Sequence, residues 1–253
     1  VIAKGSTGAT WSGYQLLIHE NNIAAEINSG GTALSTGDGL KGSSNLNDGQ
    51  WHHLAMVVDR GSNNIKLYVD GVQEVDFTNA GVSGNVDNAA NLNIATNRDA
   101  SINFIGELDE LRILNTAQTA AQVRENMHLT LRGDEGNLVS YYQFNSNELD
   151  AIGANNGTIQ GAANTTQASS VNVGRPGVAQ SLAGINGAGS QDFTNANLEM
   201  VFNSTTGTED YTVTYQNFAP NTTLGTVGTV IYSTPMWTIS KSTAATSAFD
   251  ANL

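Results

Sequence analysis

The sequence predicts an all-β fold, and three observations support this class. Apolar and polar residues alternate in short runs, Val, Ile, Leu and Tyr are common within these runs, and Gly, Asn, Ser and Thr separate them. The clearest runs are Trp51–Asp59 and Ile65–Val69, which flank a polar turn at residues 61–64. Asp70-Gly71 then favours a tight hairpin turn, so a third strand should return through Gln73–Val75. We therefore predict a three-stranded antiparallel meander.

The segments before this meander are expected to form strands and one long loop. Val1–Lys4 is a short strand, and Tyr14–Glu20 and Ile23–Asn28 pair around the polar turn Asn21-Asn22. Residues 29–47 are mostly small and polar, with three isolated leucines. We expect a solvated loop that these leucines pin to the sheet.

The segments after the meander continue the same pattern. A polar loop at residues 79–90 precedes a strand at Asn91–Ala95. Ile102–Ile105 then leads into the run Phe104–Leu114, where charged and apolar residues share both faces of the expected strand. This mixture indicates a strand near the rim of the fold, where carboxylates reach water.

One helix is expected in the chain. The sequence Thr119-Ala120-Ala121-Gln122 fits a capping box, in which the Thr119 hydroxyl and the Gln122 side chain satisfy each other's backbone amides. The helix should run to about Met127. Val123 and Met127 are spaced so that both face a sheet.

These segments resemble the laminin G-like branch of the concanavalin A-like sandwiches. The resemblance is carried by Trp51-His52-His53, a hydrophobic strand, a short loop and Leu67–Gly71, in that order. It continues at Phe104–Leu114, which resembles the closing strand of the family, and at Asn137–Phe144, which resembles its last segment. The resemblance implies a concanavalin A-like jelly-roll sandwich over about residues 1–150.

The usual opening strand of that family is missing before Val1. The resemblance therefore implies a sandwich with an exposed edge, which invites pairing with another strand. We expect the missing strand to come either from an upstream part of a longer chain or from a strand-donating partner. We also expect this chain to contact neighbouring domains of the same large protein.

The composition changes after Phe144, where Asn, Ala, Gly, Ser, Thr and Gln dominate. We predict a linker or boundary strands at residues 151–180 and a second, smaller β-sandwich at residues 181–253, truncated at its end. Alternation returns from Leu198 and indicates four or five strands. Their apolar positions are Leu198, Met200, Phe202, Tyr211, Val213, Tyr215, Val227, Val230, Tyr232, Trp237 and Ile239.

Charge and composition exclude several classes of partner. The chain has 10 Lys+Arg against 23 Asp+Glu, a net charge of -13, which repels nucleic-acid phosphates and anionic lipids. No apolar stretch approaches the roughly 20 residues that cross a bilayer, so no membrane insertion is expected. The absence of cysteine excludes disulfides and thiol chemistry. The low fraction of charged residues and the abundance of small polar residues resemble modular surface proteins of bacteria, which implies an extracellular location at the bacterial cell surface.

Four aromatic residues are candidates for stacking on sugar rings. Trp51 and Tyr68 lie within the family signature, so we expect them to pack inside the sandwich. Trp11 and Tyr14 lie in a more polar context, and we select them as candidate ligand-binding residues for glycans or glycoproteins. Core packing remains the alternative at Trp11.

Two kinds of chemistry were considered at the charged residues. The resemblance implies a structural Ca²⁺ at Asp109, with hydrogen bonding to a turn or pairing with Arg112 or Arg98 as the alternative. His52 and His53 are adjacent on a strand and should point to opposite faces, which disfavours a shared zinc ion.

The concanavalin A-like sandwich fold also occurs in bacterial laminarinases and lichenases, which are glycoside hydrolases. Glu107-Leu108-Asp109-Glu110 resembles their paired carboxylates only in part, because no second glutamate follows Asp109 at the required position.

The sequence therefore favours a non-catalytic recognition or adhesion module of a large exported bacterial surface protein that binds glycans or glycoproteins. A structural stalk or spacer unit without a ligand is the first alternative, and a glycoside hydrolase of the laminarinase type is the second. No catalytic residue is assigned.

Overall fold

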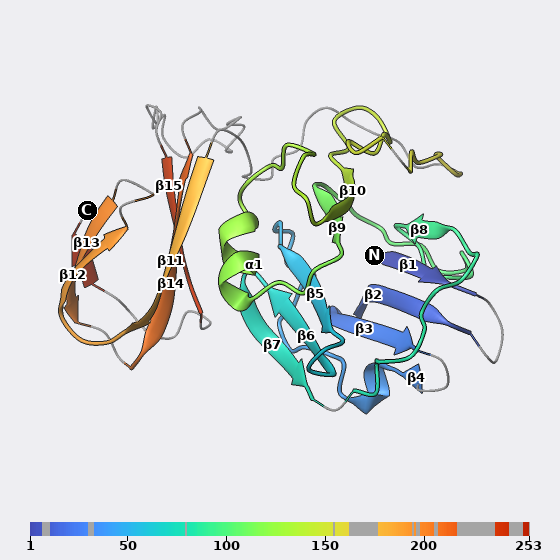
Figure 1. Cartoon of the computed structure of the whole chain (residues 1–253), viewed down its shortest axis with the longest axis horizontal. Helices are drawn as coiled ribbons and strands as arrows, with labels where there is room; N and C mark the ends of the chain where they lie inside the picture. Colours follow the sequence, from blue (N-terminus) through green and yellow to red (C-terminus); the bar gives the residue numbers. More distant parts are fainter. Residues whose placement is uncertain are drawn as a thin grey trace. The chain divides into compact units, whose positions relative to one another are not determined.

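The computed structural model describes residues 1–6, 11–29, 33–78, 80–153, 155–161, 177–193, 195, 198–204, 207–216, 236–242 and 250–252. The chain divides into two compact units, Val1–Glu107 and Leu108–Leu253. Nearly all regular structure is β-strand, so the all-β prediction is confirmed (Figure 1).

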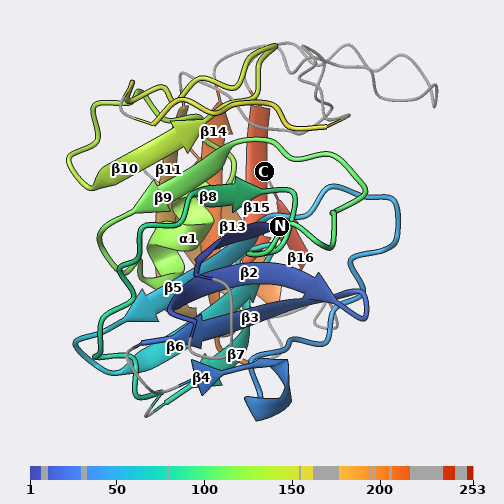
Figure 2. The same cartoon turned by 90° about the vertical axis from the view of Figure 1, so that its right-hand side faces the viewer.

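The first unit contains a five-stranded antiparallel sheet in the order β4-β3-β2-β1-β8 (Figure 2). A short 3₁₀ helix, η1 (Thr36–Asp38), follows β4. β1 lies inside the sheet, because β2 pairs along one side of it and β8 along the other. The strands are β1 (Ile2–Gly5), β2 (Gly13–His19), β3 (Asn22–Asn28), β4 (Ala33–Leu34) and β8 (Leu92–Ile94).

The predicted meander forms the second sheet of this unit, in the order β5-β6-β7. Its strands are β5 (Leu54–Asp59), β6 (Asn64–Val69) and β7 (Val72–Phe77). Asp70 and Gly71 have φ angles of 50° and 77°, so the tight turn that Asp-Gly predicts joins β6 to β7. The meander prediction is confirmed.

The two sheets of the first unit pack face to face, with β3 against β6. Ile23 and Ile27 of β3, and Ile65 and Leu67 of β6, are at most 3% exposed. Each such side chain contributes about 1.5–3 kcal/mol to folding when it leaves water. This shared core holds the outer face of the five-stranded sheet in place.

The β5 edge of the second sheet is less well covered than its centre. Met56 pairs with Leu67, so both side chains face the core, yet Leu67 is fully buried and Met56 only half-buried. β5 pairs only with β6 among the described strands. Pairing of a donated strand with such an edge stays a prediction.

The second unit begins with the two-stranded sheet β10-β9 and the only helix that the described residues contain besides η1. Their bounds are β9 (Leu111–Leu114), α1 (Ala120–Asn126) and β10 (Leu138–Tyr142). The capping box at Thr119 and Gln122 is present, and Val123 and Met127 are buried, which confirms the helix prediction. Within the described residues no helix has the length and hydropathy needed to cross a membrane.

The expected strand Phe104–Leu114 is much shorter than predicted, because β9 begins only at Leu111. Gly106 has a φ of 156°, and Glu110 has a φ of 54°, in the left-handed region. The latter conformation ends any extended run toward the N-terminus, so the alternation assumed for Glu107 and Asp109 does not apply.

Two three-stranded antiparallel sheets, β11-β14-β15 and β12-β13-β16, complete the second unit. The predicted strands around Leu198, Tyr211 and Trp237 are confirmed as β13, β14 and β15, whereas Val227–Tyr232 lies outside the described residues. The sheets share a core of Ile185, Phe193, Met200, Phe202, Tyr211 and Val213. The strands are β11 (Gly177–Ile185), β12 (Gly189–Phe193), β13 (Leu198–Ser204), β14 (Glu209–Gln216), β15 (Met236–Lys241) and β16 (Asp250–Asn252).

Candidate ligand-binding site

Trp11 and Arg98 form a stacked pair in the first unit. The Arg98 guanidinium carbon lies 4.4 Å from the centroid of the Trp11 ring. Trp11 precedes β2 and Arg98 follows β8, so residues 87 positions apart meet at the five-stranded sheet. A cation over an indole face is favourable by about 0.5–2 kcal/mol, and the contact holds the guanidinium over the ring.

Two glycines allow this close packing at the ends of β1 and β2. Gly13 has a φ of 134°, and a Cβ there would lie 2.0 Å from the Lys4 carbonyl oxygen, so only glycine fits. A Cβ on Gly5 would lie 3.5 Å from both the Trp11 ring and the Arg98 Cδ. Trp11 and Arg98 therefore cover the face of β1 to which Gly5 points.

The strand register separates the two aromatic residues selected from the sequence. Lys4 pairs with Tyr14, and residues that pair across antiparallel strands share one face of a sheet. Gly5 follows Lys4 and so points to the opposite face. Trp11 and Tyr14 therefore lie on opposite faces, and the structure does not bring them together as one binding surface.

Glu26 and Gln15 extend the Trp11–Arg98 pair across the sheet. They pair on β3 and β2, and the Gln15 Nε2 donates to the Glu26 Oε2 at 2.5 Å. The Arg98 Nη1 donates to the same oxygen at 3.4 Å. We call these four residues, Trp11, Gln15, Glu26 and Arg98, the Trp11–Arg98 cluster.

The cluster is accessible yet firmly held. The side chains of Arg98 and Glu26 are about one quarter exposed, at 25% and 24%. The Asn93 Nδ2 donates to the carbonyl oxygens of Asn97 and Arg98 at 3.1 and 3.2 Å, which fixes the backbone that carries the guanidinium. The sequence did not point to Gln15, Glu26 or Asn93, because their role depends on cross-strand register.

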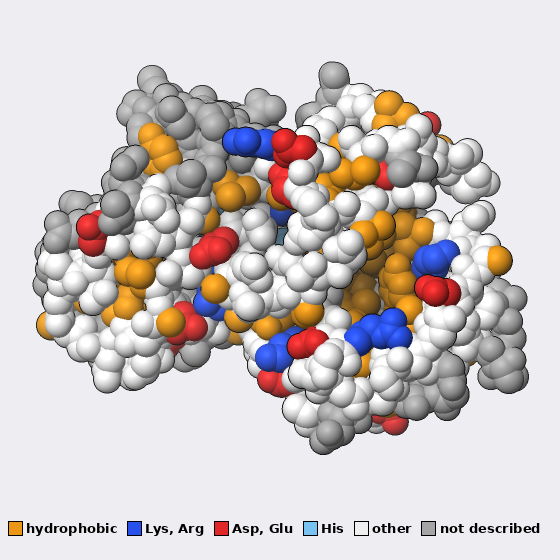
Figure 3. All heavy atoms as spheres, viewed as in Figure 1, with side chains coloured by type: hydrophobic (Ala, Val, Ile, Leu, Met, Phe, Trp, Pro, Cys, Tyr) orange, Lys and Arg blue, Asp and Glu red, His pale blue; other side chains and the backbone are white. Residues whose placement is uncertain are grey.

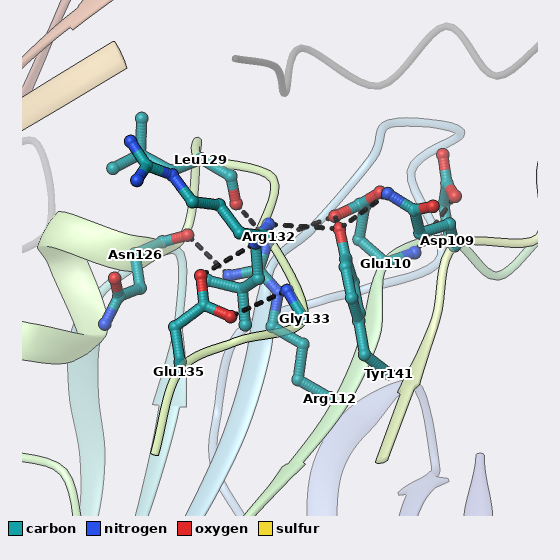
Figure 4. Close-up of polar contacts among 11 residues, drawn as sticks. Asp109, Glu110, Arg112, Asn126, Leu129, Arg132, Gly133, Glu135 and Tyr141 are labelled. Carbon is teal, nitrogen blue, oxygen red and sulfur yellow. Dashed lines mark hydrogen bonds and ion pairs between the residues drawn. The ribbon is translucent and has the colours of Figure 1, made fainter. Parts of the chain in front are cut away.

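A second polar network, in the second unit, includes the residues considered for metal binding and catalysis (Figure 4). The Tyr141 hydroxyl donates to the Glu110 carboxylate, and the Arg112 Nη2 lies 3.2 Å from the same oxygen. The Arg112 Nη1 donates to the Asn126 carbonyl at the end of α1, at 2.7 Å. The network ties β9, β10 and α1 together.

The electrostatics of Glu110 follow from its burial. Burial raises the pKa of Glu110, while the hydrogen bond from Tyr141 and the charge of Arg112 oppose that rise. Burial and the neighbouring Glu110 likewise raise the pKa of Tyr141. Both oxygen-bearing groups are thus engaged with each other, which is the arrangement expected of a structural network.

Asp109 lies beside this network in Figure 4. Its Oδ1 accepts a hydrogen bond from the Glu110 backbone amide at 2.9 Å. The described part of the chain contains no group of three or more His, Cys, Asp or Glu side chains arranged to hold a metal ion. Calcium binding at Asp109 stays a prediction, as does the role of Tyr14 in binding.

His52 bridges two carboxylates in the first unit. Its Nδ1 lies 2.8 Å from the Asp70 Oδ2 and its Nε2 lies 3.1 Å from the Asp48 Oδ1. The backbone amide of His53 donates to the other Asp70 oxygen at 2.8 Å. The imidazole thereby links the segment before β5 to the β6–β7 turn.

This bridge predicts a pH-dependent stability. Burial lowers the pKa of His52, but the hydrogen bonds to Asp70 and Asp48 outweigh it, so the pKa is raised above its usual value of 6.5. The folded state therefore holds the proton more tightly than the unfolded state. The stabilisation is present below about pH 6.5 and is lost as the pH rises through the folded pKa.

Thermal melting between pH 6 and pH 8 measures this effect. The difference in melting temperature between the wild type and His52→Gln should shrink as the pH rises, because the glutamine does not titrate. His19→Gln, at an exposed position of the same unit, is the matched control. A difference that stays constant across this range would refute the bridge as a source of stability.

The comparisons with known proteins agree with this architecture. Residues 1–124, just under half of the chain, match a family model described as the concanavalin A-like lectin/glucanases superfamily. Neither the comparison with curated proteins nor the comparison with solved structures found a match.

Proposed function

From the match of residues 1–124 to the model of the concanavalin A-like lectin/glucanases superfamily, we propose that the chain is a non-catalytic module that recognises glycans or glycoproteins. The Trp11–Arg98 cluster carries the proposal. It places an aromatic ring, a guanidinium, a carboxylate and an amide together at the surface of one sheet. Sugar-binding sites combine apolar faces with a few convergent polar groups of these kinds.

The absence of a catalytic role is part of the proposal. A retaining glycosidase needs two carboxyl groups about 5 Å apart, one as acid and one as nucleophile. Glu110 is instead bound by Tyr141 and Arg112, and Glu107 lies exposed outside any strand. These observations favour binding without hydrolysis.

The biological setting is proposed on composition. A chain with many small polar residues, a net charge of -13 and no cysteine suits an exported module at a bacterial cell surface. There it would attach a larger protein to glycans or glycoproteins. A spacer role is a second proposal, which the contacts of α1 with β11 and β14 within the second unit favour, because each unit of a stalk must be stiff.

A glycan array with purified protein tests the proposal. The wild type should bind a subset of glycans, and Trp11→Leu should bind them about tenfold more weakly, because the guanidinium loses the ring that holds it. Tyr14→Phe, on the opposite face of the sheet, tests the second residue selected from the sequence, and unchanged binding in this variant would confine the site to the face that carries Trp11. An array without any signal would refute recognition and leave the spacer.

A further inference from the structure

We infer that the Trp11–Arg98 cluster selects a neutral, hydroxyl-rich sugar residue and discriminates against one that carries a carboxylate. The inference rests on the proposed function, since it names the class of glycan that the same cluster accepts.

The cluster offers acceptors that need a donor. The hydrogen bonds from Gln15 and Arg98 to Glu26 both end on Oε2. Gln15 is 7% exposed, and its Oε1 is buried and has no hydrogen-bond partner among the described residues. Such an oxygen costs about 1–3 kcal/mol when it stays unpaired. Because that oxygen is buried, a sugar hydroxyl would donate instead to the second oxygen of Glu26, which accepts neither of these hydrogen bonds, whereas an ionised carboxylate has no proton to give.

The cluster also offers donors that need an acceptor. A guanidinium has five N–H groups, and the Arg98 side chain makes one hydrogen bond, from Nη1 to Glu26, within the described part of the chain. The contact with Trp11 holds the guanidinium over the ring. Two adjacent hydroxyls of a sugar match this pattern, because one donates to Glu26 while the other accepts from Arg98.

Charge argues against an anionic ligand at the same position. The positive charge of Arg98 is already opposed by Glu26, with 3.4 Å between the charged atoms. The chain as a whole carries a net charge of -13. On the face drawn in Figure 3, most of the Lys and Arg side chains lie beside acidic ones. A ligand carboxylate would meet Glu26 without an uncompensated cation to attract it.

The experiment compares polysaccharides that differ only in the group at C6. The probes are methyl-esterified polygalacturonate with polygalacturonate itself, and β-1,4-mannan with β-1,4-polymannuronate, titrated into the wild type, Glu26→Gln and Arg98→Gln. Glu20→Gln is the matched control, because it makes the same chemical change at an exposed carboxylate, which pairs with Lys41 at the other end of β2. Circular dichroism confirms that each variant is folded.

The wild type is expected to bind a neutral probe at least about tenfold more tightly than its carboxylated counterpart. Glu26→Gln should reduce the ratio of the two dissociation constants by about tenfold, since the charge that repels the carboxylate is gone. Arg98→Gln should weaken binding of the neutral probe. A wild type that binds a carboxylated probe as tightly as its neutral counterpart would overturn the inference, as would an unchanged ratio in Glu26→Gln. In both cases the proposed function stands, whereas a wild type that binds no probe and no glycan on the array refutes the proposed function itself.

Discussion

Replacement of Phe202 by alanine is expected to destabilise the second unit by about 3–5 kcal/mol. Phe202 is 1% exposed, and its ring lies 4.9 Å from the Tyr211 ring at an angle of 54°. Both rings belong to the core that the two three-stranded sheets share. The truncation removes the ring's contacts with both sheets and leaves a cavity where the two sheets meet.

Urea unfolding of the wild type and the variant measures this loss, and hydrogen exchange of the β13 and β14 amides locates it. Phe202→Leu keeps part of the apolar volume and should cost about 1–2 kcal/mol. Val139→Ala, at a side chain 41% exposed in the same unit, should change the free energy of unfolding by less than about 0.5 kcal/mol. If Phe202→Ala and Val139→Ala lowered the free energy of unfolding equally, the proposed core would be shown not to form.

Replacement of Arg124 by methionine is expected to have the second largest effect, a loss of about 1.5–3 kcal/mol. Arg124 lies on α1 and is only 3% exposed. Its Nε donates to the Thr212 hydroxyl at 3.0 Å, and its Nη2 lies 3.5 Å from the Asp210 Oδ2. Glu125 supports the same contact by accepting the Ser181 amide at 3.0 Å.

Methionine preserves the packing of the side-chain stem and removes the charge, so the variant isolates the polar contacts. The loss should stay below the 3–5 kcal/mol of a fully buried ion pair, because the Asp210 side chain is 38% exposed. Arg132→Met, at an exposed position of the same unit, is the control. Equal unfolding midpoints for Arg124→Met and the wild type would mean that the helix is held by apolar contacts alone.

The sequence predicted those parts of the fold that depend on residues close together along the chain. Asp70-Gly71 predicts the β6–β7 turn because it tolerates positive φ angles, and Thr119 with Gln122 predicts the start of α1 because the two side chains satisfy nearby amides. The prediction of a strand before Leu111 was wrong because Glu110 adopts a left-handed backbone conformation, which the alternation of apolar and polar residues does not reveal.

The candidate site was only partly predictable from the sequence, because it depends on how the strands pair. Trp11 stood out because a large aromatic residue lies in polar sequence, whereas Arg98 and Glu26 gained a role only when β8 and β3 were brought to β1 and β2. Tyr14 looked equivalent to Trp11 in sequence. The register of β2 separates the two onto opposite faces, and that register is a property of the folded sheet.

The central claim is that glycans bind at the Trp11–Arg98 cluster. The most direct test is nuclear magnetic resonance of the isotope-labelled protein while a glycan identified on the array is added. The indole N–H of Trp11, the Nε–H of Arg98 and the side-chain amide of Gln15 should shift together and saturate with one dissociation constant, while signals of the β6–β7 turn stay in place. Saturable glycan binding that leaves these three signals unmoved would contradict the claim, because the ligand would then occupy another surface.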